Sequence, residues 1–171
     1  ARTQFIGKPD LSALVYDELQ ISEFSSITNL KQTRDLDAHL VRIKDVHFTG
    51  EYESGSKCVV ADPEENQNAN VFAPTTENLN FPQSRVIADN AGKKTSVSTS
   101  EYAKFAHFYI PGADENGISN CPNYEGTVEG ILGFYYDNGL KYDRYPPASD
   151  DWAITIRSLD DLQLYDDEGN L

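Results

Sequence analysis

Aromatic and charged side chains gather on a loop predicted between two strands, residues 137–151. Exposed aromatic rings stack on nucleic-acid bases or on the apolar faces of sugars, and arginine hydrogen-bonds to sugar hydroxyls. The predicted ligand site combines three residues of this loop with a tyrosine expected in the loop after the first strand: Tyr142, Arg144, Tyr145 and Tyr52. The alternative is that Trp152 and about half of the tyrosines pack in or around the core.

The charge of the chain decides between these ligand classes. It carries 28 acidic against 14 basic residues, a formal net charge of −14, and its basic residues are scattered. Nucleic-acid binding depends on clustered lysine and arginine that neutralise phosphates, so we predict no nucleic-acid partner. An anionic membrane surface is disfavoured for the same reason, and no apolar run reaches the roughly 20 residues of a membrane span. The remaining partners are a glycan or another protein.

Catalytic and metal-binding motifs are missing from the sequence. The three histidines, His39, His47 and His107, do not have the spacing of a metal site, and no serine or cysteine lies in a nucleophile motif. We therefore predict no catalytic residue, no metal, no cofactor and no enzymatic activity.

Paired carboxylates leave two alternatives open. A glycosidase needs two carboxylates held about 5–9 Å apart across a cleft, whereas adjacent acids such as Asp150 and Asp151 usually point apart. Residues 114–117 and 166–170 offer oxygen ligands for calcium on turns, but neither matches the twelve-residue calcium loop. Solvated surface charge explains these acids as well.

The two cysteines, Cys58 and Cys121, also allow two interpretations. They form a disulfide if the compartment is oxidising, or else they remain two ordinary thiols.

The hydrophobic pattern predicts a mainly β protein. Residues 39–49 predict a long strand whose apolar positions change parity at Lys44-Asp45, which indicates a bulge; a straight strand buried on both faces is the alternative. A short strand at 58–61, a hairpin at 85–99 and a helix at 100–108 should follow. Residues 126–136 and 152–159 predict the closing strands, with Leu162 and Leu164 extending the last one. This order predicts an OB-fold-like Greek-key barrel with a helix between its third and fourth strands.

The predicted domains are an N-terminal extension (1–36), the OB-like barrel (37–165) and an acidic tail (166–171). Residues 11–20 have apolar residues at helical spacing, and the segment 21–36 is expected to be mostly helical, with a short strand at its start as the alternative. These helices should pack against the side or end of the barrel.

Several stretches resemble a known family. They are LVRIKDVHF (40–48), the turn at 89–92, TSVSTSEYAKFAHFYIP (95–111), GTVEGILGFYY (126–136) and WAITIRSLDDL (152–162). Over residues 37–165 the chain resembles the DUF5689 type of uncharacterised secreted or lipid-anchored Bacteroidetes proteins. The resemblance implies an OB-like barrel, export from the cytoplasm and a lipid anchor on a cysteine upstream of Ala1. The chain departs from the family by insertions at 62–83 and 112–124, and the family supplies no catalytic residues.

The expected function is therefore that of a non-catalytic extracytoplasmic binding module, located in the periplasm or on the cell surface as an outer-membrane lipoprotein. Its ligand is expected to be a glycan bound by the aromatic loop 137–151. The alternatives are a structural or protein-interaction module of a cell-surface complex and, third, a glycoside hydrolase.

Overall fold

The computed structural model describes residues 14–25, 27, 35–54, 57–60, 70–73, 83–100, 102–134 and 152–170, without the side chains of 51–54, 57–60, 83 and 134. These residues form eight strands, one α-helix and two short 3₁₀ helices. In chain order they are β1 (Asp17–Glu18), α1 (Ile21–Ser25), β2 (Leu40–Ser54), β3 (Lys57–Val60), β4 (Gln83–Asp89), β5 (Lys94–Thr99), η2 (Cys121–Asn123), β6 (Glu125–Phe134), β7 (Trp152–Thr155), η4 (Leu159–Asp161) and β8 (Leu162–Tyr165).

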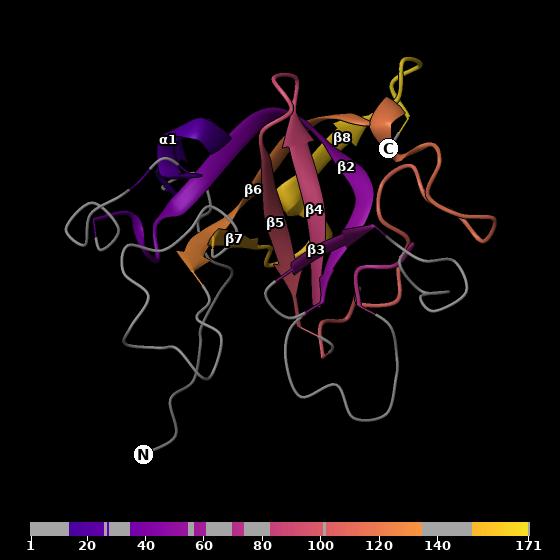
Figure 1. Ribbon diagram of the computed structural model, residues 1–171, viewed down its shortest axis with the longest axis horizontal. Helices are drawn as coiled ribbons and strands as arrows, with labels where there is room; N and C mark the ends of the chain where they lie inside the picture. Colours follow the sequence, from indigo (N-terminus) through magenta and orange to yellow (C-terminus); the bar gives the residue numbers. More distant parts are fainter. Residues whose placement is uncertain are drawn as a thin grey trace, which may run out of the picture.

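Five strands close into a mixed β-barrel in the order β2-β4-β5-β7-β6, and pairing between β6 and β2 completes the ring (Figure 1). β5 and β7 run parallel, whereas the other neighbours in the ring are antiparallel. The core inside contains the inward-facing residues of every barrel strand. The prediction of a mainly β protein with a small barrel is confirmed.

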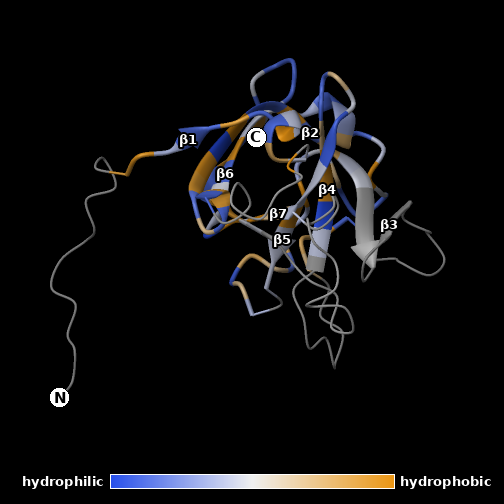
Figure 2. Cartoon of the chain, turned by 60° about the vertical axis from the view of Figure 1, so that its left-hand side comes forward, coloured by the Kyte–Doolittle hydropathy of each residue, from blue (hydrophilic) through white to orange (hydrophobic). Residues whose placement is uncertain are grey.

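The long first strand bends as predicted. Its pairing with β6 shifts register between Ile43 and Val46, and Asp45 has a positive φ of 57°. The shift allows Val41 and Ile43 before the bulge, and Val46 and Phe48 after it, all to be buried. Hydrophobic and hydrophilic residues therefore alternate along β2 and β6 in Figure 2.

β2 is longer than predicted. A second register shift lies between Phe48 and Tyr52, next to Gly50 with φ 78°, and the strand then continues to Ser54 and pairs with β3. Tyr52 is thus in a strand and not in the loop predicted there. The polar composition of residues 51–54 suggested a loop, but these residues pair with β3, which supplies their backbone hydrogen bonds.

The end of the chain forms a separate strand instead of extending β7. The 3₁₀ helix η4 interrupts the chain, and β8 then pairs antiparallel with the first half of β6. Ser158 caps η4, accepting a hydrogen bond from the Asp160 amide, while Asp161 binds back to the Ser158 amide. This capping box turns the chain out of the barrel after Ile156.

The predicted helix at 100–108 is wrong, because residues 102–109 form successive turns. The amides close i→i+3 turns in place of helical i→i+4 bonds: Ala106 donates to the Ala103 carbonyl (3.0 Å) and Phe108 to the Phe105 carbonyl (2.9 Å). The carbonyls of Ala106 and Phe108, which would have no partner within a helix ending there, accept from the amides of Ala73 (2.7 Å) and Phe72 (3.2 Å). Residues 70–73 therefore hold this series of turns in place. The two segments together cover one end of the barrel, where the rings of Phe48, Phe72 and Phe105 meet edge to face: Phe48–Phe72 centroids are 6.0 Å apart, Phe72–Phe105 5.6 Å.

The N-terminal segment packs against the barrel, but it is less helical than predicted. α1 covers only Ile21–Ser25, and its Phe24 ring meets Trp152 edge to face at 5.9 Å. Within the predicted helix 11–20, Asp17 and Glu18 instead form β1, parallel to Val41 and Arg42 of β2. β4 pairs with β2 only from Val46 onward. The earlier residues of β2 therefore offer unpaired backbone groups on that edge, and pairing with them favours a strand over a helix. No helix among the described residues is long and apolar enough to cross a membrane.

Candidate functional site

Three of the four predicted ligand residues, Tyr142, Arg144 and Tyr145, lie outside the described residues. The backbone of Tyr52 is part of β2 and pairs with Val59 and Arg85, but its side chain is not described. The aromatic-loop site therefore stays a prediction.

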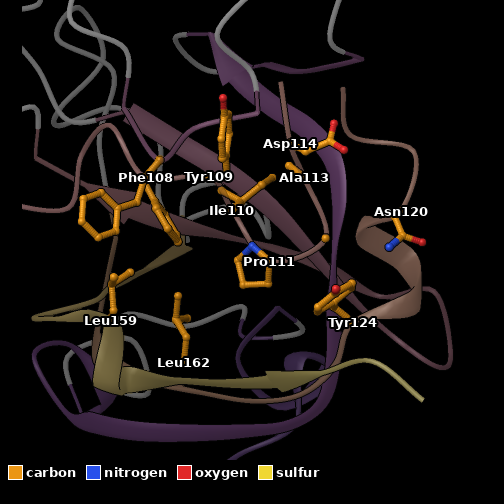
Figure 3. Close-up of a pocket in the computed structure, with 12 residues that line it drawn as sticks. Phe108, Tyr109, Ile110, Pro111, Ala113, Asp114, Asn120, Tyr124, Leu159 and Leu162 are labelled. Carbon is orange, nitrogen blue, oxygen red and sulfur yellow. The ribbon is translucent and has the colours of Figure 1, made fainter. Parts of the chain in front are cut away.

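The described part of the chain has a pocket of about 350 Å³ at the covered end of the barrel. This volume is at the lower end of the range of about 300–1,000 Å³ found for small-molecule sites. Figure 3 shows Leu159 and Leu162 facing Ile110 and Pro111 across it. The lining residues come from the 70–73 segment, the 108–124 connection, η4 and β8: Phe72, Phe108, Tyr109, Ile110, Pro111, Gly112, Ala113, Asp114, Asn120, Tyr124, Leu159 and Leu162.

Contacts between residues 70–73 and residues 108–110 hold one wall of the pocket in place. The amide of Phe72 donates to the Phe108 carbonyl at 3.2 Å, and Val71 and Tyr109 form an antiparallel bridge. Arg85, a buried residue of β4, donates from Nε to the Val71 carbonyl at 2.8 Å and from Nη1 to the Ser84 carbonyl at 2.9 Å. Arg85 thereby ties the wall to the barrel.

Gly112 lets this wall approach η2. Its φ is 82°, and a Cβ atom there would lie 2.6 Å from the Cα of Cys121 and 2.7 Å from the Asn120 carbonyl. Only glycine satisfies both the left-handed backbone and the close approach.

The pocket has an apolar floor and a more exposed aromatic wall. Phe72, Ile110 and Leu162 are buried, whereas Phe108 and Tyr109 are 55% and 49% exposed. Solvent therefore reaches these two residues at the edge of the pocket.

Two polar side chains lie at the rim. Asp114 Oδ1 accepts hydrogen bonds from the amides of Asn116 (2.7 Å) and Gly117 (3.1 Å), and the Asp114 carbonyl accepts from the Asn70 side chain at 2.6 Å. Asn120 accepts from the Asn123 side-chain amide at 2.6 Å. Both side chains are held by hydrogen bonds to their neighbours, and both belong to residues at the rim of the pocket.

Sequence reasoning missed this pocket. Residues 100–108 were predicted to be a helix with its aromatic stripe turned inward, and Leu162 was predicted to extend a barrel strand. The sequence did contain one indication, the apolar triplet 71–73 within a polar stretch. Such a triplet indicates a segment that packs against the rest of the protein.

Cys121, one half of the predicted disulfide, carries a free and fully buried thiol. The side chain of Cys58 in β3 is not described, so the pairing stays untested. Burial raises the pKa of the Cys121 thiol from 9.0 to about 12.

We expect Cys121 to resist thiol reagents in the folded protein. At pH 8, a pKa of about 12 in place of 9.0 lowers the thiolate fraction about a thousand-fold. Since the folded pKa is the higher one, the stability that the protonated thiol contributes is complete below pH 9 and is lost as the pH rises toward 12. A Cys58→Ser variant is labelled with a chromogenic disulfide in buffer and in guanidinium chloride. The ratio of the two labelling rates measures how strongly folding protects Cys121. Equal rates in the two solvents would contradict the burial, and a count of free thiols in the denatured, unreduced wild type tests the disulfide.

Ion pairs near the N-terminus attach β1 to the barrel. Glu129, a buried carboxylate of β6, binds Arg42 at 2.6 Å and raises the pKa of that guanidinium. Arg42 also lies over the Tyr16 ring at 4.6 Å. The hydrogen bond and charge of Lys44 lower the pKa of Glu18 in β1. His39, one of the histidines considered as a ligand, binds Asp17 at 2.6 Å in the same place, which is a structural role.

A second ion pair follows β7. The Asp161 carboxylate is buried and accepts from the Arg157 amide at 2.6 Å and from its guanidinium at 2.5 Å. The hydrogen bond between the guanidinium and the Asp161 carboxylate raises the pKa of Arg157, whose Nη2 also donates to the Tyr16 hydroxyl at 3.0 Å. The same arginine thus joins the N-terminal segment to η4.

No group of three or more histidine, cysteine, aspartate or glutamate side chains with metal-binding geometry occurs within the described ranges. In the two turns considered for calcium, the carboxylates of Asp114 and Asp166 bind amides of their own turns. For Asp166 these bonds, led by that from the Asn170 side chain, lower its pKa.

Comparison of the chain with protein-family models, curated proteins and solved structures gives no match. The resemblance to the DUF5689 type stays an interpretation of the sequence.

Proposed function

We propose that this protein is a non-catalytic binding module built on an OB-like barrel, and that it binds a glycan. The observation that carries the proposal is the pocket lined by Phe108, Tyr109 and Tyr124, with Asp114 and Asn120 at its rim. We further propose an extracytoplasmic location, for which the sequence resemblance is the only support.

The order of the strands supports an OB-like barrel. An OB-fold is a five-stranded Greek-key barrel in which the first strand is followed around the ring by the second, third, fifth and fourth. β2, β4, β5, β7 and β6 occupy these places, and the parallel pair β5–β7 corresponds to the third and fifth strands. In place of the usual helix after the third strand, this chain has the turns at 102–109 and the 70–73 segment.

The position of the pocket differs from the usual OB ligand face over the second and third strands. Val86 and Ser96 form a register pair of β4 and β5 on the face opposite to the core residues Ile87 and Val97. Both Val86 and Ser96 are fully buried, so this face is not open at its centre. The proposal therefore places the ligand at the covered barrel end.

The chemistry of the pocket suits a sugar. The apolar face of a pyranose packs against an aromatic ring, and its hydroxyl groups bind carboxylate and amide side chains. Tyr109 and Phe108 supply exposed rings, and Asp114 and Asn120 supply the polar atoms. Among the described lining residues Asp114 supplies the one carboxylate, whereas glycosidases use a pair, which favours binding over hydrolysis.

A protein ligand is the second candidate. Tyr102 is 87% exposed and belongs to the same turn segment as Phe108 and Tyr109. Exposed aromatic residues on one segment are typical of protein-interaction sites. Co-purification of a partner from native expression, lost on substitution of Tyr102, would favour this function.

Substitution of Tyr109 by alanine is expected to weaken glycan binding about five- to ten-fold, because stacking on one ring is worth roughly 1–1.5 kcal/mol. The wild type is first screened on a glycan array, and each hit is then measured by calorimetry with both proteins. The matched control is Tyr165→Ala, which removes a tyrosine of similar exposure (42%) from β8 outside the pocket and should leave affinity unchanged. Absence of binding across the whole array would overturn the proposal.

A further inference from the structure

We infer that the ligand of this pocket carries positive charge, and that the glycan class it prefers contains free amino groups, as in glucosamine oligosaccharides. The inference rests on the proposed function and adds the charge of the ligand to it.

The described lining of the pocket lacks basic side chains. None of the described residues that line the pocket is lysine, arginine or histidine, and Asp114 supplies one negative charge at the rim. The whole chain has a net charge of −14, so its field attracts cationic ligands and repels anionic ones. A uronic-acid or sulfated glycan would therefore meet repulsion without a local partner.

The aromatic residues of the pocket also favour a cationic ligand. The faces of aromatic rings attract ammonium groups, more strongly where water is excluded than at exposed sites. Phe108, Tyr109 and Tyr124 all line the pocket, and each is partly exposed. A protonated amine on a sugar ring would gain this attraction in addition to the stacking that any sugar gains.

The Asp114 carboxylate is held by hydrogen bonds to one of its two oxygens. Its Oδ1 is bound by two amides at 2.7 and 3.1 Å, while Oδ2 has only a 3.5 Å contact with the Asn116 side chain. The backbone thus orients the carboxylate through one oxygen, and the other oxygen has capacity to accept from an ammonium group. Figure 3 shows Asp114 at the rim beside Ala113, so the amine would lie at the mouth of the pocket.

The hydrogen bonds of Asp114 make Asp114→Asn a suitable test variant. In Asp114→Asn the amide oxygen can accept the same two backbone hydrogen bonds, because asparagine is favoured in this type of turn. The substitution removes the charge and keeps the turn. The matched control is Asp167→Asn, which removes the same charge from an exposed position in the turn after β8.

The experiment measures, by calorimetry at low salt, the affinity for a glucosamine oligosaccharide and for its N-acetylated counterpart of the same length, at a pH where the amines are protonated. The wild type is expected to bind the amine form about ten-fold more tightly. Asp114→Asn should reduce this preference several-fold and Asp167→Asn less than two-fold, because only the first charge lies at the pocket. Thermal unfolding of each variant checks that the fold is kept.

The outcomes separate the two claims. Equal affinity for both forms, preference for the acetylated form, or an equal effect of the two substitutions would overturn the inference about charge while the glycan site stands. If Tyr109→Ala binds the amine form as tightly as the wild type, the attraction is a general one to an acidic surface and the pocket is not the site. If neither form binds and the glycan array is also negative, the proposed function fails with it.

Discussion

Replacement of Trp152 by alanine is expected to lower the free energy of unfolding by about 3–5 kcal/mol. Trp152 is the largest fully buried side chain, and it joins the first residue of β7 to the ring of Phe24 in α1. Its removal leaves a cavity between the barrel and α1 that the β-strands are too rigid to fill. Domains are stable by only about 5–15 kcal/mol, so the loss would be a large part of the total.

Chemical denaturation followed by far-UV circular dichroism measures this effect, since Trp152 is the one tryptophan and its fluorescence disappears with it. Tyr102→Ala is the control, because a ring that is 87% exposed should change stability by less than about 0.5 kcal/mol. A loss below about 1 kcal/mol in Trp152→Ala would show that Trp152 does not hold α1 against the barrel.

Substitution of Gly126 by alanine should destabilise the protein by about 3 kcal/mol, at the upper end for an overpacked site. A Cβ atom at this position of β6 would lie 1.9 Å from the carbonyl oxygen of Gln163 in β8. A backbone carbonyl cannot rotate away as the end of a flexible side chain does, so β6 and β8 would have to separate. Because Leu162 of β8 also lines the pocket, glycan affinity should fall together with stability.

Gly133→Ala is the matched control in the same strand. There the nearest atom to a new Cβ is Asp37 Oδ1 at 3.7 Å, an ordinary contact, and the backbone φ does not require glycine. This variant should be as stable as the wild type or slightly more stable, because alanine restricts the unfolded chain. Tryptophan fluorescence during denaturation reports both variants, and equal stability of the two would contradict the close approach of β6 and β8.

The elements that were predicted correctly have local signals in the sequence. The parity change between Ile43 and Val46 favoured a bulge over a straight strand, and the register shift lies there. The turn at 89–92 between an apolar run and an alternating one predicted the β4–β5 hairpin, and alternation after Trp152 predicted β7. In each case neighbouring residues decide which side chains face the core.

The wrong predictions share a different cause. Residues 100–108 have a helical stripe, but their amides close i→i+3 turns, and the 70–73 segment binds the carbonyls of Ala106 and Phe108. Asp17 and Glu18 lie within a similar stripe, but an open edge of β2 and the ion pair of Glu18 with Lys44 favour a strand. Nothing near these residues in the sequence specifies the competing partner.

The sequence by itself therefore determined the mainly β fold class and the principal barrel strands, because alternation and turn chemistry are properties of short segments. Only the tertiary structure decided how the barrel end is covered, that β8 is a separate strand, and that Tyr109, Asp114 and Leu162 line one pocket. Each of these depends on hydrogen bonds and packing between segments far apart in the chain. Segments compete for these contacts, and no single segment contains all the residues that decide which contacts form.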